Sequence, residues 1–436
     1  MIRSRCGGRR ALERAAGAAL LAALMLSVTA CTEDASEPEP AAADPEDDAS
    51  VENALGEPNA AAGTPVKVGL ITNGAECPEC GGAPADEEPV AQATVQWLNE
   101  YMNGLGGHEI ELDICVDDLD AAKTTDCANQ LISDGVVAVV LASNGVIETA
   151  WNVLHGAGVP VVSIGATQAD LVTDDASTFI TNDAQANVAD LPLSVAKDVG
   201  ADKVSVIVIN LGIATEIFEG DTPQTFEQEG VDLDVVPVDI GTADMTSQAQ
   251  EIVRDNPDGV VMVVGHDEFC IPAIDGLNAV GFTGTIVTIG QCLTPATREA
   301  IPGDVLDGIV LASQAPLLDD EDPSVQQYRA VLQEFGATDV DPEDVIAHSV
   351  FVAFGAISVG TEALDGDVTP ESVIASLRAM PNSLMPGSGG RHFQCDGNVA
   401  PGRPAICSSS LFAATLDADG LPVSYELIND TGDDGA

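Results

Sequence analysis

Short apolar runs alternate with amphipathic stretches along the chain from residue 66 to residue 313. The runs VVAVVLA and VSVIVIN are continuous and rich in β-branched residues, which is typical of strands buried on both faces of a parallel sheet. The stretches between the runs, such as CIPAIDGLNAVG, place apolar residues at helical spacing. The pattern therefore predicts an α/β fold in which helices cover both faces of parallel sheets. The predicted strands are residues 66–72, 109–117, 136–142, 159–165, 178–181, 203–210, 233–240, 259–265, 284–290 and 308–313.

The alternation falls into two blocks, residues 65–180 and 185–312, and two longer helices follow them. A single hydrophobic core rarely serves a chain of this length, so we expect two domains. No G-x-G-x-x-G motif follows the first strand and no Walker lysine occurs in the chain. Nucleotide binding therefore has no support in the sequence.

The N-terminus has the pattern of an exported lipoprotein. Five arginines lie within residues 1–14, and an apolar run too short for a membrane span follows them. The run ends at Val28-Thr29-Ala30-Cys31, which resembles the lipobox in which a cysteine is acylated and becomes the new N-terminus. We expect residues 1–30 to be a signal peptide and Cys31 to carry a lipid anchor. An ordinary secretory peptide with an incidental cysteine is the alternative.

Residues 31–64 have the composition of a disordered tether. Ten acidic residues, no basic residue and almost no large apolar residue lie between residues 32 and 64, so the segment cannot bury enough surface to fold. The whole chain carries a formal charge of −56, and removal of residues 1–30, with five arginines and one glutamate, makes it −60. Such a charge disfavours nucleic acids and anionic membrane surfaces as partners. A saline habitat and a requirement for solubility would both account for it.

Metal sites and familiar catalytic arrangements are not apparent. The five histidines show neither H-x-x-x-H nor H-E-x-x-H spacing, and no EF-hand loop occurs. No G-x-S-x-G elbow follows any predicted strand, which argues against a serine hydrolase. We therefore expect a protein that is not an enzyme and that needs no cofactor or metal.

Eight cysteines remain once Cys6 and Cys31 are set aside, and an even number in an oxidising compartment favours disulfides. The predicted elements favour one set of pairings, because each brings a strand end beside its neighbouring helix or closes a hairpin loop. The CPEC segment fits a structural disulfide, a redox centre or a metal site, and we favour the first because Gly81, Gly82 and Pro84 follow it in place of a helix start. The predicted pairs are Cys115 with Cys127, Cys270 with Cys292, Cys395 with Cys407, and Cys77 with Cys80.

Open α/β sheets bind ligands at the carboxyl ends of their strands, so the residues that follow each strand are candidates. Ser143-Asn144-Gly145 follows the third strand, and SIGATQADL begins at Ser163 on the fourth. Hydroxyl groups and free backbone N–H groups at such junctions suit a ligand carboxylate, although these residues also commonly do no more than cap a helix.

The chain resembles the type I periplasmic binding proteins, in particular the leucine/isoleucine/valine-binding and related amide- or urea-binding lipoproteins that feed ABC transporters. The resemblance rests on four segments in order, LNEYMNGLGGHEIELDICVDD, TTDCANQLISDGVVAVVLASNG, GVPVVSIGAT and RHFQCDGNV. It implies two Rossmann-like lobes, joined by three crossings near residues 181–183, 313–316 and 385–390, that close on a ligand as on a hinge. The implied boundaries are residues 65–182 with 314–386 for lobe one, 183–313 with 387–428 for lobe two, and 429–436 for a disordered tail.

The resemblance also implies a set of ligand contacts at the strand ends of both lobes. Amino-acid binders of the family carry an acid where this chain has Gln291, so either Asp267 or Glu268 replaces that acid or the ligand lacks an ammonium group. The CPEC segment takes the place of a ligand-contacting loop. The implied contacts are Asn73, Gly74, Ser143, Asn144, Gly145, Gly165, Ala166 and Thr167 from lobe one, and Asn210, Gly212, His266, Asp267 and Gln291 from lobe two.

The resemblance implies an extracytoplasmic solute-binding lipoprotein on the outer face of the cell membrane. It would capture a small polar ligand, a branched-chain or other amino acid in the first instance, and deliver it to an ABC permease. Three alternatives stay open: a ligand sensor of the same fold that signals to a membrane partner, a binder of an amide- or urea-type solute, and a thiol oxidoreductase that uses the CPEC pair.

Overall fold

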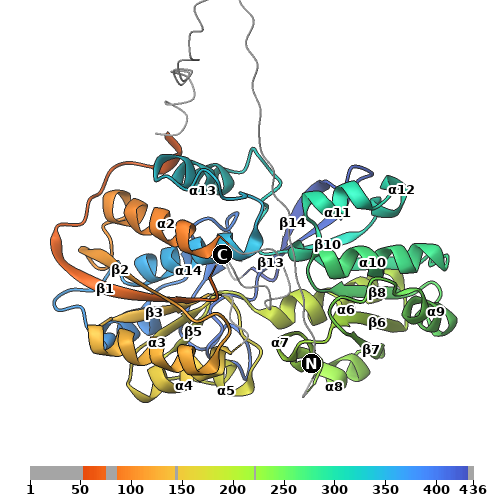
Figure 1. Ribbon diagram of the computed structural model, residues 1–436, viewed down its shortest axis with the longest axis horizontal. Coiled ribbons are helices and arrows are strands. Elements are labelled where there is room, and N and C mark those ends of the chain that lie inside the picture. The colour runs from red at the N-terminus through yellow and green to blue at the C-terminus, as the bar shows by residue number, and fades with distance from the viewer. Residues whose placement is uncertain (1–52, 75–85, 143–145, 220–221, 431–436) are drawn as a thin grey trace, which may run out of the picture. The chain divides into compact units, whose positions relative to one another are not determined.

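The N-terminal block forms the first of two large sheets. The computed structural model describes residues 53–74, 86–142, 146–219 and 222–430 (Figure 1). Five parallel strands lie in the order β2-β1-β3-β4-β5. This order confirms the predicted parallel α/β architecture, and we call the sheet and its helices lobe one. The strands are β1 (Gly63–Thr72), β2 (His108–Val116), β3 (Ala138–Leu141), β4 (Val161–Ser163) and β5 (Thr178–Ile180).

Two hydrophobic cores cover the two faces of this sheet. Val68, Leu70 and Val140 point to one face and pack with the helices α2, α13 and α14. Ile71 and Val139 point to the other face, where α3 and α4 cover them. The alternation of side chains between two buried faces explains why a central strand such as β3 is apolar throughout, whereas the edge strand β2 reads HEIELDICV. The helices of lobe one are α2 (Glu87–Tyr101), α3 (Ala121–Asp134), α4 (Ile147–Gly156), α5 (Ala169–Val172), α13 (Pro323–Glu334), α14 (Val345–Gly360) and α15 (Pro370–Ala379).

The second sheet has seven strands in the order β14-β13-β10-β9-β8-β6-β7, and with its helices it forms lobe two (Figure 1). The strands β6 to β10 are parallel, whereas β13 and β14 are antiparallel additions at one edge. Its strands are β6 (Lys203–Ile209), β7 (Asp232–Val238), β8 (Val260–Val264), β9 (Thr285–Ile289), β10 (Val310–Ser313), β13 (Leu411–Leu416) and β14 (Pro422–Ile428). Its helices are η1 (Ala186–Asp190), α6 (Leu191–Val199), α7 (Gly212–Thr215), η2 (Glu216–Phe218), α8 (Thr222–Gln228), α9 (Thr246–Asp255), α10 (Asp267–Ala279), η3 (Gly290–Cys292), α11 (Pro295–Ala300) and α12 (Gly303–Leu306).

The segment between the small hairpin and β13 packs with lobe one. The hairpin pairs β11 (Ser383–Leu384) with β12 (His392–Phe393). Cys395 and Cys407 then lie in the core of lobe one, and Ile406 forms a bridge to Ile180 at the end of β5. The sequence-based division assigns residues 387–428 to lobe two. We propose instead that the third crossing lies at residues 408–410, because Cys395, Ile406 and Cys407 are buried in the cores of lobe one.

Buried polar side chains tie the crossing segments to one another. Asp183 forms an ion pair with Arg403 and accepts a hydrogen bond from Ser409 Oγ at 3.1 Å. Burial and the nearby charge of Asp183 raise the pKa of Asp190. Buried charges of this kind persist in proteins only when they are paired or hydrogen-bonded, so the first and third crossings form one polar cluster.

Three of the predicted disulfides are present. They join Cys115 to Cys127, Cys270 to Cys292 and Cys395 to Cys407. The predicted Cys77–Cys80 pair and the predicted lipidation site Cys31 lie outside the described residues. Among the described residues, no helix is both long and apolar enough to span a bilayer.

Candidate ligand-binding site

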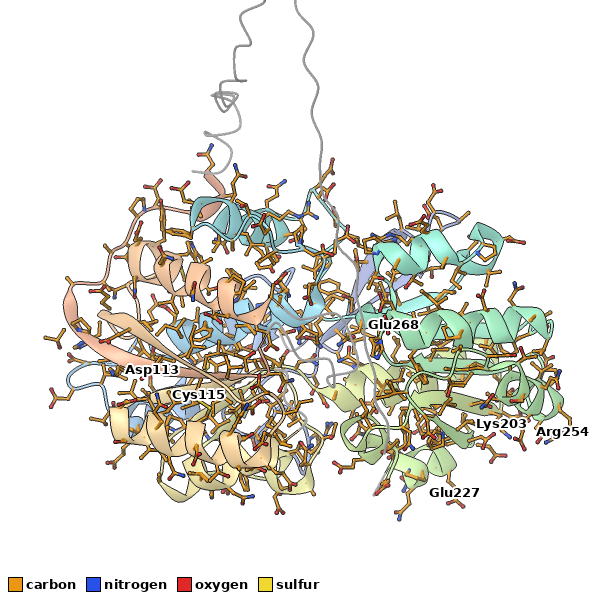
Figure 2. The ribbon with its side chains drawn as sticks, viewed as in Figure 1. Asp113, Cys115, Lys203, Glu227, Arg254 and Glu268 are labelled. Atoms are coloured by element: carbon orange, nitrogen blue, oxygen red, sulfur yellow. A yellow bond between two sulfur atoms is a disulfide. The ribbon has the colours of Figure 1, made fainter. Side chains whose placement is uncertain are left out.

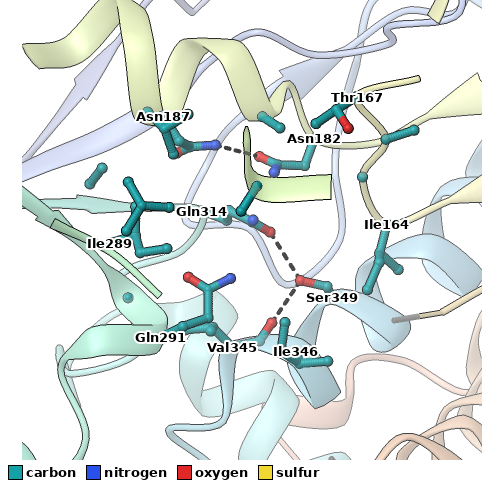
Figure 3. Close-up of a pocket in the computed structure, with 18 of the residues that line it drawn as sticks. Ile164, Thr167, Asn182, Asn187, Ile289, Gln291, Gln314, Val345, Ile346 and Ser349 are labelled. Carbon is teal, nitrogen blue, oxygen red and sulfur yellow. Dashed lines mark hydrogen bonds between the residues drawn. The ribbon is translucent and has the colours of Figure 1, made fainter. Parts of the chain in front are cut away.

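A cavity of about 230 Å³ lies where the carboxyl ends of strands from both sheets meet (Figure 3). Residues 164–167 follow β4, Gln291 follows β9 and Gln314 follows β10. The site thus occupies the edge at which parallel α/β sheets bind their ligands. The lining comprises Ala142, Ile147, Ile164, Gly165, Ala166, Thr167, Asn182, Ala184, Asn187, Val188, Ala214, Ile217, Val264, Ile289, Gly290, Gln291, Ala312, Ser313, Gln314, Val345, Ile346 and Ser349.

The same local turn ends β4 in lobe one and β10 in lobe two. Ser163 Oγ donates to the carbonyl of Gly165 at 2.7 Å and accepts from the N–H of Gly165 at 3.3 Å. Ser313 Oγ makes the corresponding contacts with Ala315, at 2.6 Å and 3.5 Å. A serine hydroxyl that bonds the backbone two residues ahead turns the chain out of the strand. These turns carry residues 164–167 and Gln314 across the cavity.

Four carboxamide side chains supply most of the polarity of the cavity. Asn187 Nδ2 donates to Asn182 Oδ1 at 3.2 Å and to the carbonyl of Asp183 at 3.0 Å (Figure 3). Ser349 Oγ lies 3.0 Å from Gln314 Oε1 and 2.6 Å from the carbonyl of Val345. The Asp183 carbonyl makes Nδ2 the donor end of Asn187 and so makes Oδ1 the acceptor end of Asn182. The single hydrogen of the Ser349 hydroxyl, in contrast, is shared between Val345 and Gln314. The Nδ2 of Asn182, the Nε2 of Gln314 and the whole carboxamide of Gln291 have no hydrogen-bond partner in the described part of the chain, and none of these atoms is buried.

The rest of the lining is apolar and carries no charge. Thirteen of the 22 lining residues are alanine, valine or isoleucine, so a ligand that fills the cavity must present an apolar body. None of the described lining residues is ionisable. The neighbouring positions 143–145, Ser-Asn-Gly, contain no ionisable side chain in the sequence either.

A buried arginine stands behind Gln314. Arg391 is 1 % exposed, and its Nη1 donates to the backbone carbonyl of Gln314 at 2.8 Å. Its other contacts are with the hydroxyl groups of Ser408 and Ser410, each at 3.4 Å. Burial lowers the pKa of Arg391 to about 10, so the guanidinium remains a cation at neutral pH. A positive charge with neutral hydrogen-bond partners therefore lies behind Gln314 and contacts the backbone of this lining residue.

The Cys270–Cys292 disulfide fixes the element that carries Gln291. Cys292 ends η3, and Cys270 lies in the first turn of α10. Both cysteines are buried, at 1 % and 0 % exposure. The covalent link limits how far Gln291 can move relative to α10.

The cavity includes four of the thirteen contacts that the sequence implies. These are Gly165, Ala166, Thr167 and Gln291. Ser143, Asn144 and Gly145 lie outside the described residues. Six further positions, Asn73, Gly74, Asn210, Gly212, His266 and Asp267, are absent from the lining.

Most of these six residues have local structural contacts. Asp267 accepts from Thr294 Oγ1 at 3.0 Å and from the N–H of Glu268 at 2.8 Å, which joins α10 to α11. Asn210 Nδ2 donates to Asp239 Oδ1 at 2.8 Å, and the N–H of Gly74 donates to Thr72 Oγ1 at 3.2 Å. The ring nitrogens of His266 are buried without a hydrogen-bond partner.

Five polar lining residues are not among the contacts implied by the sequence, and one of them, Ser313, is the last residue of β10. Gln314 comes directly after β10 and Asn182 comes two residues after β5, so the strand-end rule that selected Thr167 also applies to them. Asn187 lies on η1, and Ser349 lies on α14, a helix that is buried almost all round. No sequence signal distinguishes Ser349 from the serines and alanines that surround it.

The fold and the cavity define a two-lobed α/β binding protein with its site between the sheets. A family model described as periplasmic binding protein matches residues 65–405. The chain therefore belongs to the periplasmic binding protein family. The match confirms the resemblance drawn from the sequence, and this family is a class of binding proteins for transport.

Solved structures of this class share the fold. A leucine-binding protein from Thermotoga maritima is 17% identical, with a TM-score of 0.62 over 83% of this chain and 97% of that one. A solute-binding protein of an ABC transporter from R. palustris, in complex with 4-hydroxybenzoate, is 21% identical, with a TM-score of 0.65 over 85% and 99%. An ABC transporter substrate-binding protein from Sphaerobacter thermophilus is 18% identical, with a TM-score of 0.67 over 84% and 99%. A comparison with curated proteins gives no match.

Proposed function

We propose that this protein captures a small organic solute between its two lobes and delivers it to an ABC permease. The observation that carries the proposal is the cavity itself, which is enclosed by strand ends of both sheets and combines an apolar wall with free amide groups. A cavity between two lobes joined by crossing segments can open and close around a ligand. Membership of the periplasmic binding protein family supports the same role, and no enzymatic step is part of the proposal.

The location is a further part of the proposal. The N-terminal sequence fits export followed by acylation of Cys31, which would hold the protein on the outer face of the cell membrane through its lipid alone. The acidic segment 31–64 would then separate the binding lobes from the membrane surface. Mass spectrometry of the protein isolated from membranes tests this point, because acylation at Cys31 requires the loss of residues 1–30.

Two classes of ligand follow from the relatives and from the sequence. Branched-chain amino acids are the first, since the Thermotoga maritima protein is a leucine-binding protein. Acids or amides without an amino group are the second, and the R. palustris complex with 4-hydroxybenzoate belongs to this class. The alternative role of a ligand sensor would use the same capture of a solute. It differs from transport only in the membrane partner that recognises the closed form of the protein.

A thermal-shift screen of amino acids, organic acids, amides and urea tests the capture of a solute. A ligand that binds only the native state raises the melting temperature with the logarithm of its concentration over its Kd. We expect at least one of these solutes to raise it in a saturable manner. Failure of every class to do so would contradict the proposal.

A further inference from the structure

We infer that the ligand carries an acyl oxygen, as carboxylate or carboxamide, on an apolar body and lacks an ammonium group. The inference rests on the proposed function, and it concerns the chemistry of the ligand that the same cavity selects.

The cavity offers free amide N–H groups to a ligand. Asn182 offers Nδ2, because its oxygen accepts from Asn187. Gln314 offers Nε2 in the orientation shown, in which its oxygen lies 3.0 Å from the Ser349 hydroxyl. Gln291 offers both a donor and an acceptor, and Asn187 Oδ1 is a buried acceptor without a partner in the described part of the chain. Carbonyl and carboxylate oxygens accept from such N–H groups, whereas an ammonium has only donors to offer. The cavity therefore suits an acyl oxygen better than an ammonium group.

A ligand ammonium would find no carboxylate in the described lining. A charged group that leaves water needs an opposite charge or several hydrogen bonds, and the free side-chain acceptors of the described lining, Gln291 Oε1 and the buried Asn187 Oδ1, are both neutral amide oxygens. Gln291 thus supplies an amide, and no carboxylate, at the end of β9.

Two acids that lie near the lining along the chain are already engaged. Asp183 pairs with Arg403 and accepts from Ser409, and Asp267 accepts from Thr294. Glu268, labelled in Figure 2, is exposed on the first turn of α10 and lies beside a separate groove. To recruit Asp183 or Asp267, a ligand would have to break an existing contact.

The charge of Arg391 also favours an acyl oxygen over an ammonium group. Its guanidinium contacts the backbone of Gln314, and its three hydrogen-bond partners are neutral oxygens. Asp430 lies near enough to stabilise this charge, but none of the three hydrogen bonds goes to an acid. A positive charge in a poorly solvated region repels a ligand cation and attracts an anion or the oxygen end of a dipole. Both effects favour an acyl oxygen next to Gln314.

Ligands with one carbon skeleton and different charges test the inference directly. For the leucine skeleton the set is 4-methylpentanoate, 4-methylpentanamide, leucine and leucinamide, and the phenylalanine and tyrosine skeletons give parallel sets. Calorimetric titration with the purified, mature chain is expected to give a Kd at least about tenfold lower for the acid or the amide than for the matching amino acid. The ratio of acid to amide then identifies which acyl group the cavity prefers.

The other outcomes separate the inference from the proposed function. Tighter binding of leucine or leucinamide than of their counterparts without the amino group would overturn the inference and leave solute capture intact. No binding by any member of the three sets would also overturn it, and the broader thermal-shift screen would then decide the proposed function independently.

A substitution at Gln291 provides a second test. Gln291→Glu adds the acid that an ammonium requires without a change of shape, so it is expected to weaken binding of the acid about tenfold and to strengthen binding of the amino acid. Gln250→Glu makes the same change at an exposed site on α9, outside the cavity, and should alter neither Kd. Equal affinities in the two variants for both ligands would contradict the inference. The melting temperatures of the ligand-free variants check that both are folded.

Discussion

At the scale of single residues, the acid expected to bind an ammonium has another role in the structure. Asp267 is partly buried between its own N-terminal turn and Thr294, and it does not line the cavity. The amide at Gln291 lies in the cavity instead. The sequence alone does not show which of Asp267 and Gln291 lines the cavity, because both residues follow strand ends.

We expect Asp267→Asn to leave ligand affinity within about twofold of the parent. The asparagine oxygen can still accept from Thr294, so the link between α10 and α11 remains. Titration of the best ligand of the screen measures the effect. A loss of affinity of tenfold or more would place Asp267 in the site.

Thr167→Ala is expected to weaken binding about fivefold, since Thr167 lines the cavity and a hydrogen bond contributes about 1 kcal/mol. Thr173→Ala removes an exposed hydroxyl that bonds only the backbone carbonyl of Ala169 and serves as the matched control. Calorimetric Kd values for both variants give the comparison. If the two variants bind equally well, Thr167 makes no contact with the ligand.

At the scale of elements, each of the ten predicted strands overlaps one of the strands β1 to β10. The central strands β3 and β8 are continuous apolar runs because both of their faces are buried, whereas the edge strands β2 and β7 also carry charged residues. The segments of β13 and β14 are absent from the prediction. β14 reads PVSYELI, which lacks a continuous apolar run, and the two strands form an antiparallel edge outside the parallel blocks. Asn182 and Gln314 were likewise attributed to the crossings, although both also follow a strand end and line the cavity.

The helix α14 contains a buried histidine, His348, whose protonation at acidic pH favours the unfolded chain. Burial lowers the pKa of His348 to about 4, while its ring nitrogen lies 2.8 Å from the carbonyl of Gly387. The unfolded chain takes up a proton near pH 6.5 and the folded chain only near pH 4, so stability falls as the pH decreases across that interval.

We expect His348→Gln to lose less stability than the parent between pH 6.5 and pH 4, by up to about 3 kcal/mol. Glutamine keeps a donor for Gly387 and does not titrate. Urea unfolding at several pH values provides the free energies. Asp344, whose pKa is raised by burial, titrates in both proteins and cancels in the comparison. Parallel pH profiles for the two proteins would contradict this role of His348.

At the scale of the whole molecule, nearly every cation is already neutralised. Ten lysines and arginines follow residue 30, and eight of them pair with acids. Arg254 and Lys203 are two of these, on lobe two (Figure 2). Arg378 and Arg391 bond to neutral oxygens. The remaining acidic groups have no compensating charge and repel one another.

We expect the melting temperature to rise by several degrees when the salt concentration increases from about 0.05 M to about 1 M, because salt screens this repulsion. Sodium and potassium chloride should act alike, since screening depends on ionic strength. Differential scanning calorimetry measures the shift. A melting temperature that is constant or lower in salt would contradict the importance of the acidic surface for stability.

The central claim is that the cavity between the two lobes holds the ligand, and a glycine on its wall allows a direct test. A side chain at Gly165 would have no atom within 4 Å of its Cβ, and Gly165 lines the cavity. The Cβ of Gly165→Phe should therefore clear its neighbours, and the ring should occupy space in the cavity. Gly156→Phe places the same side chain at an exposed glycine of the same lobe, also with no atom within 4 Å.

Calorimetric titration of these two variants with the best ligand of the screen is the decisive measurement. We predict that Gly165→Phe abolishes binding while its ligand-free melting temperature stays close to that of the parent, and that Gly156→Phe binds as the parent does. Unchanged affinity in Gly165→Phe would show that the ligand binds elsewhere on the protein.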